Sequence, residues 1–277
     1  MKNQKVILIT GASSGIGKDA ALRLLKEGHM VYGAARRVEQ MEELVQAGGK
    51  AIKMDITEET DILACVEQII NEQGSIDVLI NNAGYGLYGA VEDISIDEAR
   101  RQFEVNLFGL ARITQAVLPH MRKQKSGKII NMSSIGGKIY TPLGSWYHAT
   151  KHALEGWSDC LRIELKQFNI DVVIVEPGLI ATEFGDVVHG PMLKHSGEGV
   201  YAEMAQTMAK ATKNSYEKKG ASSPPSVISD VIVKAIYAKK PKTRYAAGKM
   251  AKIMLFIRKY FSDRMFDKIL TTVRTAD

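Results

Sequence analysis

Residues 6–17 read VILITGASSGIG, a short apolar run that leads into three spaced glycines. The run Val6–Thr10 has the length and the β-branched composition of a buried strand. Gly11 permits a tight turn, Gly15 lets the backbone approach a phosphate group, and Gly17 allows a helix to pack closely on the strand. A helix that begins here presents N–H groups and the positive end of its dipole to an anion. The expected anion-binding residues are Gly11, Ser13, Ser14, Gly15, Ile16 and Gly17.

Strands and helices alternate along the rest of the chain. Short β-branched runs predict strands at Val6–Thr10, Met30–Ala35, Lys50–Met54, Ile76–Asn81, Lys128–Met132, Ile170–Glu176 and near Thr243–Ala246. Apolar residues at helical spacing predict helices at Ile16–Glu27, Glu39–Ala47, Glu59–Gln73, Asp97–Lys123, Trp146–Phe168 and Val227–Lys239. Apolar strands separated by helices are typical of a parallel sheet covered on both faces. With right-handed crossovers, this order predicts an α/β fold with a doubly wound parallel sheet, the Rossmann fold.

The strand rhythm stops between Gly185 and about Pro225, where one helix is expected at Tyr201–Glu217. A stretch this long is either a lid over a site or a disordered insertion. We expect a single domain in three parts: a dinucleotide-binding and catalytic core at 1–185, a substrate lid at 186–225, and a last helix, strand and basic amphipathic helix at 226–277.

The composition is that of a soluble globular protein, with 45% apolar and 25% charged residues among 277. The apolar run at residues 6–9 is too short for a signal peptide. Ile253–Ile257 is the longest apolar stretch of the C-terminal part, far below the ~20 residues that cross a bilayer. Cys65 and Cys160 cannot form a disulfide framework, so we expect free thiols in a cytoplasmic protein.

Positive charge is concentrated near the C-terminus. Residues 234–277 contain twelve basic and three acidic side chains, whereas residues 1–233 contain twenty-five basic and twenty-eight acidic ones. No zinc-finger spacing or aromatic RNA-binding motif accompanies this region, so nucleic acid is not expected as a partner. The last predicted helix has an apolar stripe, Met250, Ile253, Met254, Ile257 and Phe261, flanked by Lys249, Lys252, Arg258, Lys259 and Arg264. Such a helix, at 249–264, packs on its own domain or on a second subunit of a homo-oligomer, or lies on an anionic membrane.

The residues after the second expected strand bear on the choice of dinucleotide. An acidic side chain about twenty residues beyond the glycines would bind the ribose 2′-OH of NAD. The chain has Ala34-Ala35-Arg36-Arg37 at that position. Arg36 suits a 2′-phosphate, with Ser13 as a helper, so NADP(H) is the expected cofactor and a surface arginine pair is the alternative.

Tyr147 and Lys151 are four residues apart, on one face of a predicted helix, and Ser134 stands thirteen residues before the tyrosine. A lysine in this position stabilises a tyrosinate and is expected to lower the pKa of the phenol. Ser134 would bind the same substrate oxygen, although Ser133 competes for this role. Tyr245 and Lys249 have the same spacing but lack a serine at the matching distance.

Together these residues resemble the short-chain dehydrogenase/reductase family, over residues 5–185 well and over the remainder loosely. Thr10–Gly17 resembles the family's phosphate loop, and Asn81-Asn82-Ala83-Gly84 resembles its N-N-A-G strand end. The family's Asn-Ser-Tyr-Lys tetrad corresponds to Asn106, Ser134, Tyr147 and Lys151. Its stretch beside the nicotinamide corresponds to Pro177, Gly178, Ile180 and Thr182.

The resemblance implies an NADP(H)-dependent enzyme that interconverts a carbonyl and an alcohol. Tyr147 would donate the proton, Lys151 would also hold the nicotinamide ribose, and Asn106 would support a water chain. Asn82 would border the adenosine ribose, while Ile180 and Thr182 would hold the carboxamide. Asp55, with Ile56 beside it, would bind the adenine. A catalytically silent NADP(H)-binding sensor on the same fold is the alternative, which the intact tetrad disfavours.

The expected substrate pocket is apolar and without an arginine cluster, which favours a lipophilic steroid, retinoid or acyl-type substrate. The candidate substrate residues are Tyr88, Ser134, Ile135, Leu143 and Tyr147, with Leu87, Thr141, Pro142 and Met192 as further walls. Core packing is the alternative for each wall residue. Gly84, Gly86 and Gly89 are interpreted as a substrate-side loop, because no helix follows them at once. His148, His189 and His195 lack metal-ligand spacing, so no metal is expected.

Overall fold

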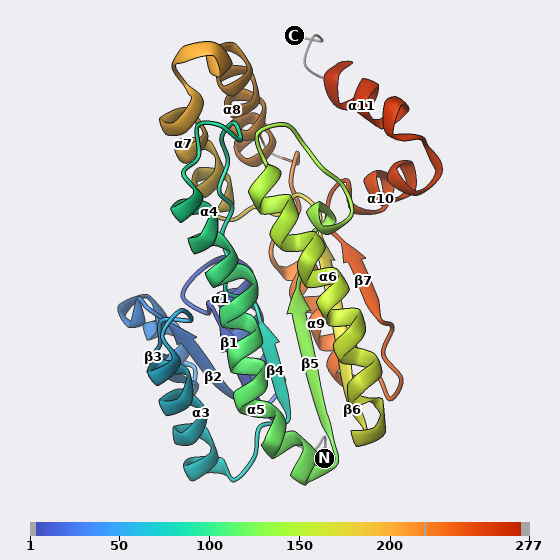
Figure 1. The fold of residues 1–277 in the computed structure, drawn as a ribbon. Coiled ribbons are helices and arrows are strands. Elements are labelled where there is room, and N and C mark those ends of the chain that lie inside the picture. The colour runs from blue at the N-terminus through green and yellow to red at the C-terminus, as the bar shows by residue number, and fades with distance from the viewer. Residues whose placement is uncertain (1–3, 219, 273–277) are drawn as a thin grey trace.

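A computed structural model describes residues 4–218 and 220–272 (Figure 1). Its sheet has seven parallel strands in the order β3-β2-β1-β4-β5-β6-β7. The strands are β1 Val6–Thr10, β2 Met30–Ala35, β3 Lys50–Lys53, β4 Val78–Asn81, β5 Gly127–Met132, β6 Ile170–Pro177 and β7 Arg244–Ala247. The chain leaves β1 toward β2 and β3, then returns to the other side of β1 at β4. The predicted doubly wound sheet is therefore confirmed. The ends of the expected core and C-terminal ranges, residues 1–3 and 273–277, lie outside the described residues.

Helices cover both faces of the sheet (Figure 1). The core helices are α1 Gly15–Lys26, α2 Glu42–Gln46, α3 Glu59–Gln73, α4 Ile96–Phe103, α5 Leu110–Gln124, α6 Ser145–Leu165 and α9 Ser226–Tyr237. The helices above the carboxyl ends of the strands are α7 Phe184–Ser196, α8 Ala202–Glu217, α10 Ala251–Tyr260 and α11 Asp263–Thr272.

Strand β1 shows why the sheet needs both layers. Ile7 and Ile9 point to one face and pack with α1 and α9, whereas Leu8 points to the other and packs with α3 and α5. All three side chains have no exposed surface. Because alternate residues of a strand face opposite sides, a continuous apolar run is stable when helices exclude water from both.

Two buried asparagines, Asn81 and Asn131, hold the central strands against their helices. Asn81 of β4 donates to Asn131 of β5 and to Thr114 of α5, at 2.9 and 3.1 Å. Asn131 in turn donates to Ser158 of α6, at 2.9 Å. These buried amides link neighbouring strands and helices through specific partners, so they fix the lateral position of the helices.

The helix expected at Asp97–Lys123 is interrupted. Ser95 begins α4 with a capping box to Glu98, and a π-helical turn, Glu104–Gly109, separates α4 from α5. Gly109 lies so close to the backbone carbonyl of Ile56 that a Cβ would overlap it. The extra residue of the π turn adjusts the helix locally, a change that apolar periodicity does not predict.

Two expectations for the C-terminal third are corrected. The segment after Gly185 contains a helix that the sequence analysis missed, α7, with Pro191 inside it. Burial of Val188 and Met192 against α8 outweighs the low helix propensity of proline and glycine. The single basic helix expected at the end is two, because the chain turns at Phe261–Ser262 and buries Phe266 completely.

Lys128 of β5 caps the C-terminal end of α9. Its Nζ donates to the carbonyl oxygens of Ala235, Ile236 and Ala238, at 2.7, 2.9 and 2.9 Å. These carbonyls belong to the end of the helix, where intrahelical donors are missing and a positive charge is favourable.

We predict that Lys128→Met lowers the free energy of unfolding by about 2–3 kcal/mol, because it leaves three carbonyls without their charged donor. Urea denaturation followed by circular dichroism measures the difference. Lys123→Met, at an exposed lysine of α5, is the matched control and should stay within about 0.5 kcal/mol of the parent chain. Equal stability of the two variants would contradict the capping role.

Candidate active site

One cavity of about 800 Å³ lies beyond the carboxyl ends of the strands. Its walls come from the turns after β1, β2, β3, β4, β5 and β6, together with α6 and the α7–α8 pair. This is the crevice where open α/β sheets bind ligands, since the strand order reverses between β1 and β4.

The glycine turn has the geometry expected for a phosphate. Gly11 and Gly15 have φ angles of +68° and +54°, a region that favours glycine. A Cβ at Gly11 would lie 2.8 Å from the Cα of Ala83, and one at Gly17 would overlap the carbonyl of Gly11. The side chain of Ser14 makes no capping hydrogen bond to the first turn of α1. Of the six expected residues, all but Gly17 line the cavity; Gly17 instead permits the close packing.

Asn82 and Thr10 hold this turn in place. The side-chain amide of Asn82 donates to the carbonyls of Thr10 and Gly11, both at 3.1 Å. The hydroxyl of Thr10 accepts from the backbone N–H groups of Asn82 and Ala83, both at 3.0 Å. The first and fourth strands are thereby joined at their carboxyl ends, where the cavity begins.

Cationic and anionic groups meet at the end of the cavity nearest β2 and β3. Arg36, Arg37, Asp55 and Ile56 line it, as does Arg101 of α4, which the sequence analysis did not select. Burial opposes ionisation of Asp55, but hydrogen bonds from Thr57 and the charges of Arg36 and Arg101 bring its pKa below the usual value. Arg101 comes from a distant helix, so local sequence carries no signal for it.

The expected catalytic groups converge on the other half of the cavity. Tyr147 and Lys151 of α6 are buried, at 6% and 7% exposure, and both line the cavity with Ser134. The ammonium of Lys151 lies 6.0 Å from the centre of the Tyr147 ring and donates to the carbonyl of Met132, at 2.8 Å. Ser133, the competing serine, also lines the cavity but is more buried.

The pKa of Tyr147 was expected to lie below its usual value, and in this structure it lies above it. Burial raises the pKa of Tyr147 to about 12, against the lowering effect of its hydrogen bond with Ser134. Burial also lowers the pKa of Lys151 to about 8, while Glu155 raises it. Removal from water disfavours the charged form of each group, and it is the largest cause of both shifts.

Asn106 supports the site from the π turn. Its side chain accepts from the N–H of Tyr85 and donates to the carbonyl of Tyr85, at 3.0 and 2.9 Å. It also donates to Thr150 of α6, at 3.1 Å. Asn106 is 1% exposed and lies outside the cavity lining, and its hydrogen bonds join the loop after β4 to α6.

His148 has a structural role that the sequence analysis did not assign. Its Nδ1 lies 2.9 Å from the carbonyl of Gly136, and its Nε2 accepts from the N–H of Thr141, at 3.0 Å. Burial lowers its pKa, which favours the neutral ring that this pairing requires. The imidazole therefore fixes the loop between β5 and α6, where Ser134 and Ile135 stand.

The predicted substrate walls are partly corrected. Leu87, Tyr88, Ile135 and Thr141 line the cavity, but Pro142, Leu143 and Met192 do not. Leu143 has a φ angle of +64° and packs with Met192 in the apolar cluster formed by α7 and α8. The predicted cofactor contacts after β4 and β6 also line the cavity: Asn82, Ala83, Gly84, Pro177, Gly178, Ile180 and Thr182. Further walls that only the fold brings here are Tyr85, Ile139, Phe184, Val187, Pro191 and Tyr216.

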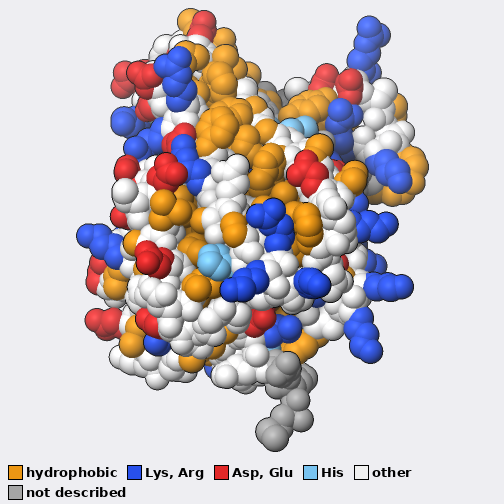
Figure 2. Space-filling model, turned by 60° about the horizontal axis from the view of Figure 1, so that its bottom comes forward, with side chains coloured by type: hydrophobic (Ala, Val, Ile, Leu, Met, Phe, Trp, Pro, Cys, Tyr) orange, Lys and Arg blue, Asp and Glu red, His pale blue; other side chains and the backbone are white. Residues whose placement is uncertain are grey.

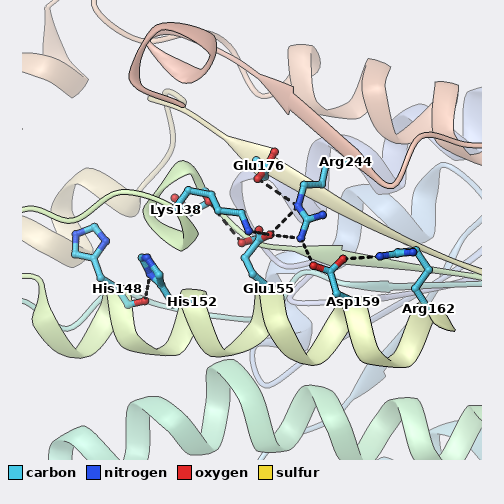
Figure 3. Close-up of polar contacts among 10 residues, drawn as sticks. Lys138, His148, His152, Glu155, Asp159, Arg162, Glu176 and Arg244 are labelled. Atoms are coloured by element: carbon cyan, nitrogen blue, oxygen red, sulfur yellow. Dashed lines mark hydrogen bonds and ion pairs between the residues drawn. The ribbon is translucent and has the colours of Figure 1, made fainter. Parts of the chain in front are cut away.

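A cluster of charged side chains, with Glu155 and Glu176 buried at its centre, lies between α6 and the strands β6 and β7 (Figure 3). Glu155 accepts from Arg244 at 2.9 Å, and Lys138 lies 3.1 Å from the same carboxylate. Asp159 accepts from Arg244 at 2.6 Å. Glu176, 3.8 Å from Arg244, has its pKa raised to about 7 by burial and by the charge of Glu155. The cluster anchors β7 to α6 and places a carboxylate one turn beyond Lys151.

The described residues contain neither a metal-binding cluster nor a membrane-spanning helix. Among residues 4–218 and 220–272, no group of three or more metal-ligating side chains could hold a metal ion. Over those same residues, every helix is too short or too polar to span a lipid bilayer.

The fold and the cavity define a dinucleotide-binding protein with the side chains of carbonyl and alcohol chemistry. The model of the short chain dehydrogenase family matches residues 5–189. This chain belongs to the short-chain dehydrogenase family of oxidoreductases.

Individual relatives extend over most of the chain. A 3-ketodihydrosphingosine reductase of Bacteroides thetaiotaomicron is 38% identical over 250 residues, covering 90% of each chain. A solved short-chain dehydrogenase of Streptomyces avermitilis is 33% identical, with a TM-score of 0.82 over 100% of this chain and 99% of that one. An actinorhodin polyketide ketoreductase, solved with NADPH, is 31% identical, with a TM-score of 0.71 over 85% of this chain and 91% of that one.

We predict that Glu155→Gln moves the high-pH limb of kcat to lower pH. The change removes a negative charge that raises the pKa of Lys151, so the lysine loses its proton earlier as the pH rises. Steady-state turnover of a ketone between pH 6 and 10 measures the shift. Asp159→Asn also removes a partner of Arg244 but lies two turns from Lys151, so its profile should match that of the parent enzyme. Coincident profiles for all three proteins would exclude the electrostatic role of Glu155.

Proposed function

We propose that this protein is an NADP(H)-dependent oxidoreductase that interconverts a carbonyl and a secondary or primary alcohol on a lipophilic substrate. The observation that carries the proposal is the convergence of Ser134, Tyr147 and Lys151 on the same cavity as the glycine turn. One end of this cavity can hold a dinucleotide phosphate, and the other has an acid and a hydroxyl beside an apolar wall.

The cofactor, when bound, would supply or accept the hydride, and the chain's own residues would manage the proton. Tyr147 has a pKa of about 12, so it is protonated at neutral pH and can donate its proton to a developing alkoxide. Ser134 would donate a second hydrogen bond to this oxygen and stabilise the charge that grows there. Lys151, with a pKa of about 8, is largely cationic at neutral pH and favours the phenolate that remains.

Proton return to the tyrosine would pass along the lysine side of the site. Lys151 contacts the carbonyl of Met132, and Gly84 leaves space beside its ammonium, since a Cβ there would lie 3.8 Å from Nζ. A Cβ at Gly84 would also lie 3.1 Å from Oδ1 of Asn106. Asn106 would thus have a positioning role, because it holds the loop that carries Gly84 beside the lysine.

The apolar wall supports a lipophilic substrate. The ring of Tyr147 lies 5.7 Å from that of Tyr88 and 5.6 Å from that of Phe184, measured between centroids. Leu87, Ile135 and Ile139 extend the same surface. An apolar wall of this kind favours substrates with a large apolar surface, because removing that surface from water on binding is favourable. The similarity to a 3-ketodihydrosphingosine reductase is consistent with this substrate class.

Arg36 supports the choice of NADP(H). It stands at the cavity end that faces Asp55, directly after β2, where an acidic residue would favour NAD. Solved proteins of similar fold include complexes with NADPH and with NADH, so the fold does not distinguish the two cofactors. The preference for NADP(H) is therefore inferred from the positive charge of Arg36.

We predict that Arg36→Asp raises the KM for NADPH about tenfold or more, with a smaller effect on NADH, because it removes a charge-assisted contact to the 2′-phosphate. Initial rates with both cofactors and one ketone measure the ratio. Arg100→Asp, at an exposed arginine of α4 outside the cavity, should leave both KM values unchanged. Equal losses with the two cofactors would contradict the phosphate contact.

We predict that Tyr147→Phe lowers kcat for ketone reduction by about 10²- to 10⁴-fold while the dissociation constant for NADPH changes little, because the variant loses the acid and keeps the ring. Ketone-dependent NADPH oxidation and fluorescence titration measure the two quantities. Turnover at the parent rate would exclude Tyr147 as the proton donor. Dinucleotide binding without turnover of any ketone or alcohol by the parent chain would favour the silent sensor instead.

A further inference from the structure

The segment of residues 249–272, here called the C-terminal hairpin, exposes large apolar side chains. Met250, Ile253, Phe256, Tyr260 and Met265 are 38%, 58%, 58%, 63% and 49% exposed. Ile253, Phe256 and Tyr260 follow one another at helical spacing on α10, and the rings of Phe256 and Tyr260 lie 4.8 Å apart. A contiguous apolar surface of this kind marks a contact site more often than scattered single residues do.

The hairpin packs on its own domain through a different face. Phe266 is fully buried, and its ring lies 5.2 Å from that of Tyr140. The guanidinium of Arg258 lies over both rings, at 5.8 and 5.3 Å, and Tyr140 donates to Asp267 at 2.9 Å. Because these contacts fix the orientation of α10, the apolar row on its outer face is held toward solvent.

The same outer surface is basic. Lys249, Lys252, Lys259 and Arg264 are exposed, and the described residues include no ion pair to any of them. The described acidic residues of the hairpin are engaged elsewhere, since Asp263 binds Arg258 at 2.8 Å and Asp267 binds Tyr140. In Figure 2, apolar and basic side chains lie together on the lobe at the upper right, where the hairpin projects.

We propose that the C-terminal hairpin docks this protein on the surface of an anionic lipid bilayer. Aromatic and aliphatic side chains of an interfacial helix enter the headgroup region, while lysines and arginines beside them bind lipid phosphates. A second copy of the chain fits this surface less well, because a two-fold contact would bring its unpaired cations against their own copies.

The position of the hairpin connects docking to the cavity. Figure 1 places α10 and α11 at the same end of the molecule as α7 and α8, beyond the carboxyl ends of the strands. The N–H of Leu179 donates to the carbonyl of Lys249 at 3.0 Å, and Leu179 lines the cavity. Tyr140, which Phe266 contacts, precedes the cavity residue Thr141. A bilayer that holds the hairpin would therefore lie beside the cavity, where a lipophilic substrate would enter. This last step rests on the proposed function.

Flotation of the full chain with phospholipid vesicles tests the proposal. We expect binding to vesicles that contain about 30% phosphatidylglycerol and little binding to pure phosphatidylcholine. Lys252→Gln with Lys259→Gln should weaken the partition coefficient about 25-fold, because each charge near the surface contributes roughly fivefold. Ile253→Ser with Phe256→Ser should reduce it by a similar factor, since each removes an apolar side chain from the interface.

Two matched control variants test whether the losses are specific to the hairpin or follow from removing any exposed lysines or apolar side chains. Lys239→Gln with Lys240→Gln removes two exposed lysines between α9 and β7, at the opposite end of the sheet. Leu63→Ser with Ile163→Ser removes exposed apolar residues of α3 and α6, which are 52% and 68% exposed. Both control pairs should float like the parent chain, and equal losses in the control and hairpin variants would overturn the proposal.

Two further outcomes would also overturn it. One is absence of the parent chain from anionic vesicles; the other is a parent dimer, measured by light scattering, that Ile253→Ser with Phe256→Ser converts to monomer. Circular dichroism confirms that each variant is folded. Flotation requires no turnover, so its failure is distinct from failure of the oxidoreductase assignment. Turnover of a short water-soluble ketone should be equal in the parent chain and all hairpin variants.

Discussion

The close contact between the glycine turn and the end of β4 is the constraint on which the site depends. Gly11 lies against the backbone of Ala83, Gly17 lies against Gly11, and Asn82 donates to the turn carbonyls from the side. This contact points the first turn of α1 toward the cavity. It also aligns β1 with β4, the pair at which the strand order reverses and the crevice opens. A side chain at Gly11 or Gly17 would separate these parts.

Burial governs the chemistry that this crevice can perform. Tyr147 and Lys151 are both nearly inaccessible to water, and burial moves their pKa values in opposite directions, to about 12 and about 8. At neutral pH the phenol of Tyr147 therefore keeps its proton, whereas Lys151 binds its proton less strongly than an exposed lysine does. A charged network behind α6 compensates, since Glu155 faces Arg244 and Lys138 while favouring the cationic form of Lys151. The anchoring of β7 and the acid–base balance of the site thus share one set of side chains.

The elements added above the sheet give this scaffold its particular character. Helices α7 and α8 bury their own small cluster with Leu143 and supply Phe184 and Tyr216 to the cavity wall. The C-terminal hairpin contacts the loop before α6 through Phe266 and Tyr140. An apolar cavity and an exposed apolar, basic surface consequently lie at one end of the molecule. The proposed substrate class and the proposed docking surface agree in their chemistry, although separate observations support each.

The sequence by itself determined the parallel sheet, the phosphate turn and the groups of the site, because these depend on local periodicity and on motifs with fixed spacing. The sequence also distinguished the second tyrosine–lysine pair: Tyr245 lies on strand β7, accepts from the N–H of Lys242 and does not line the cavity. The tertiary structure alone decided the π turn at Asn106, the helix that contains Pro191, and the removal of Leu143 from the cavity. It also brought in Arg101 and His148 and reversed the expected pKa of Tyr147. These features depend on packing between distant segments and on exclusion of water, which neither propensity nor spacing records.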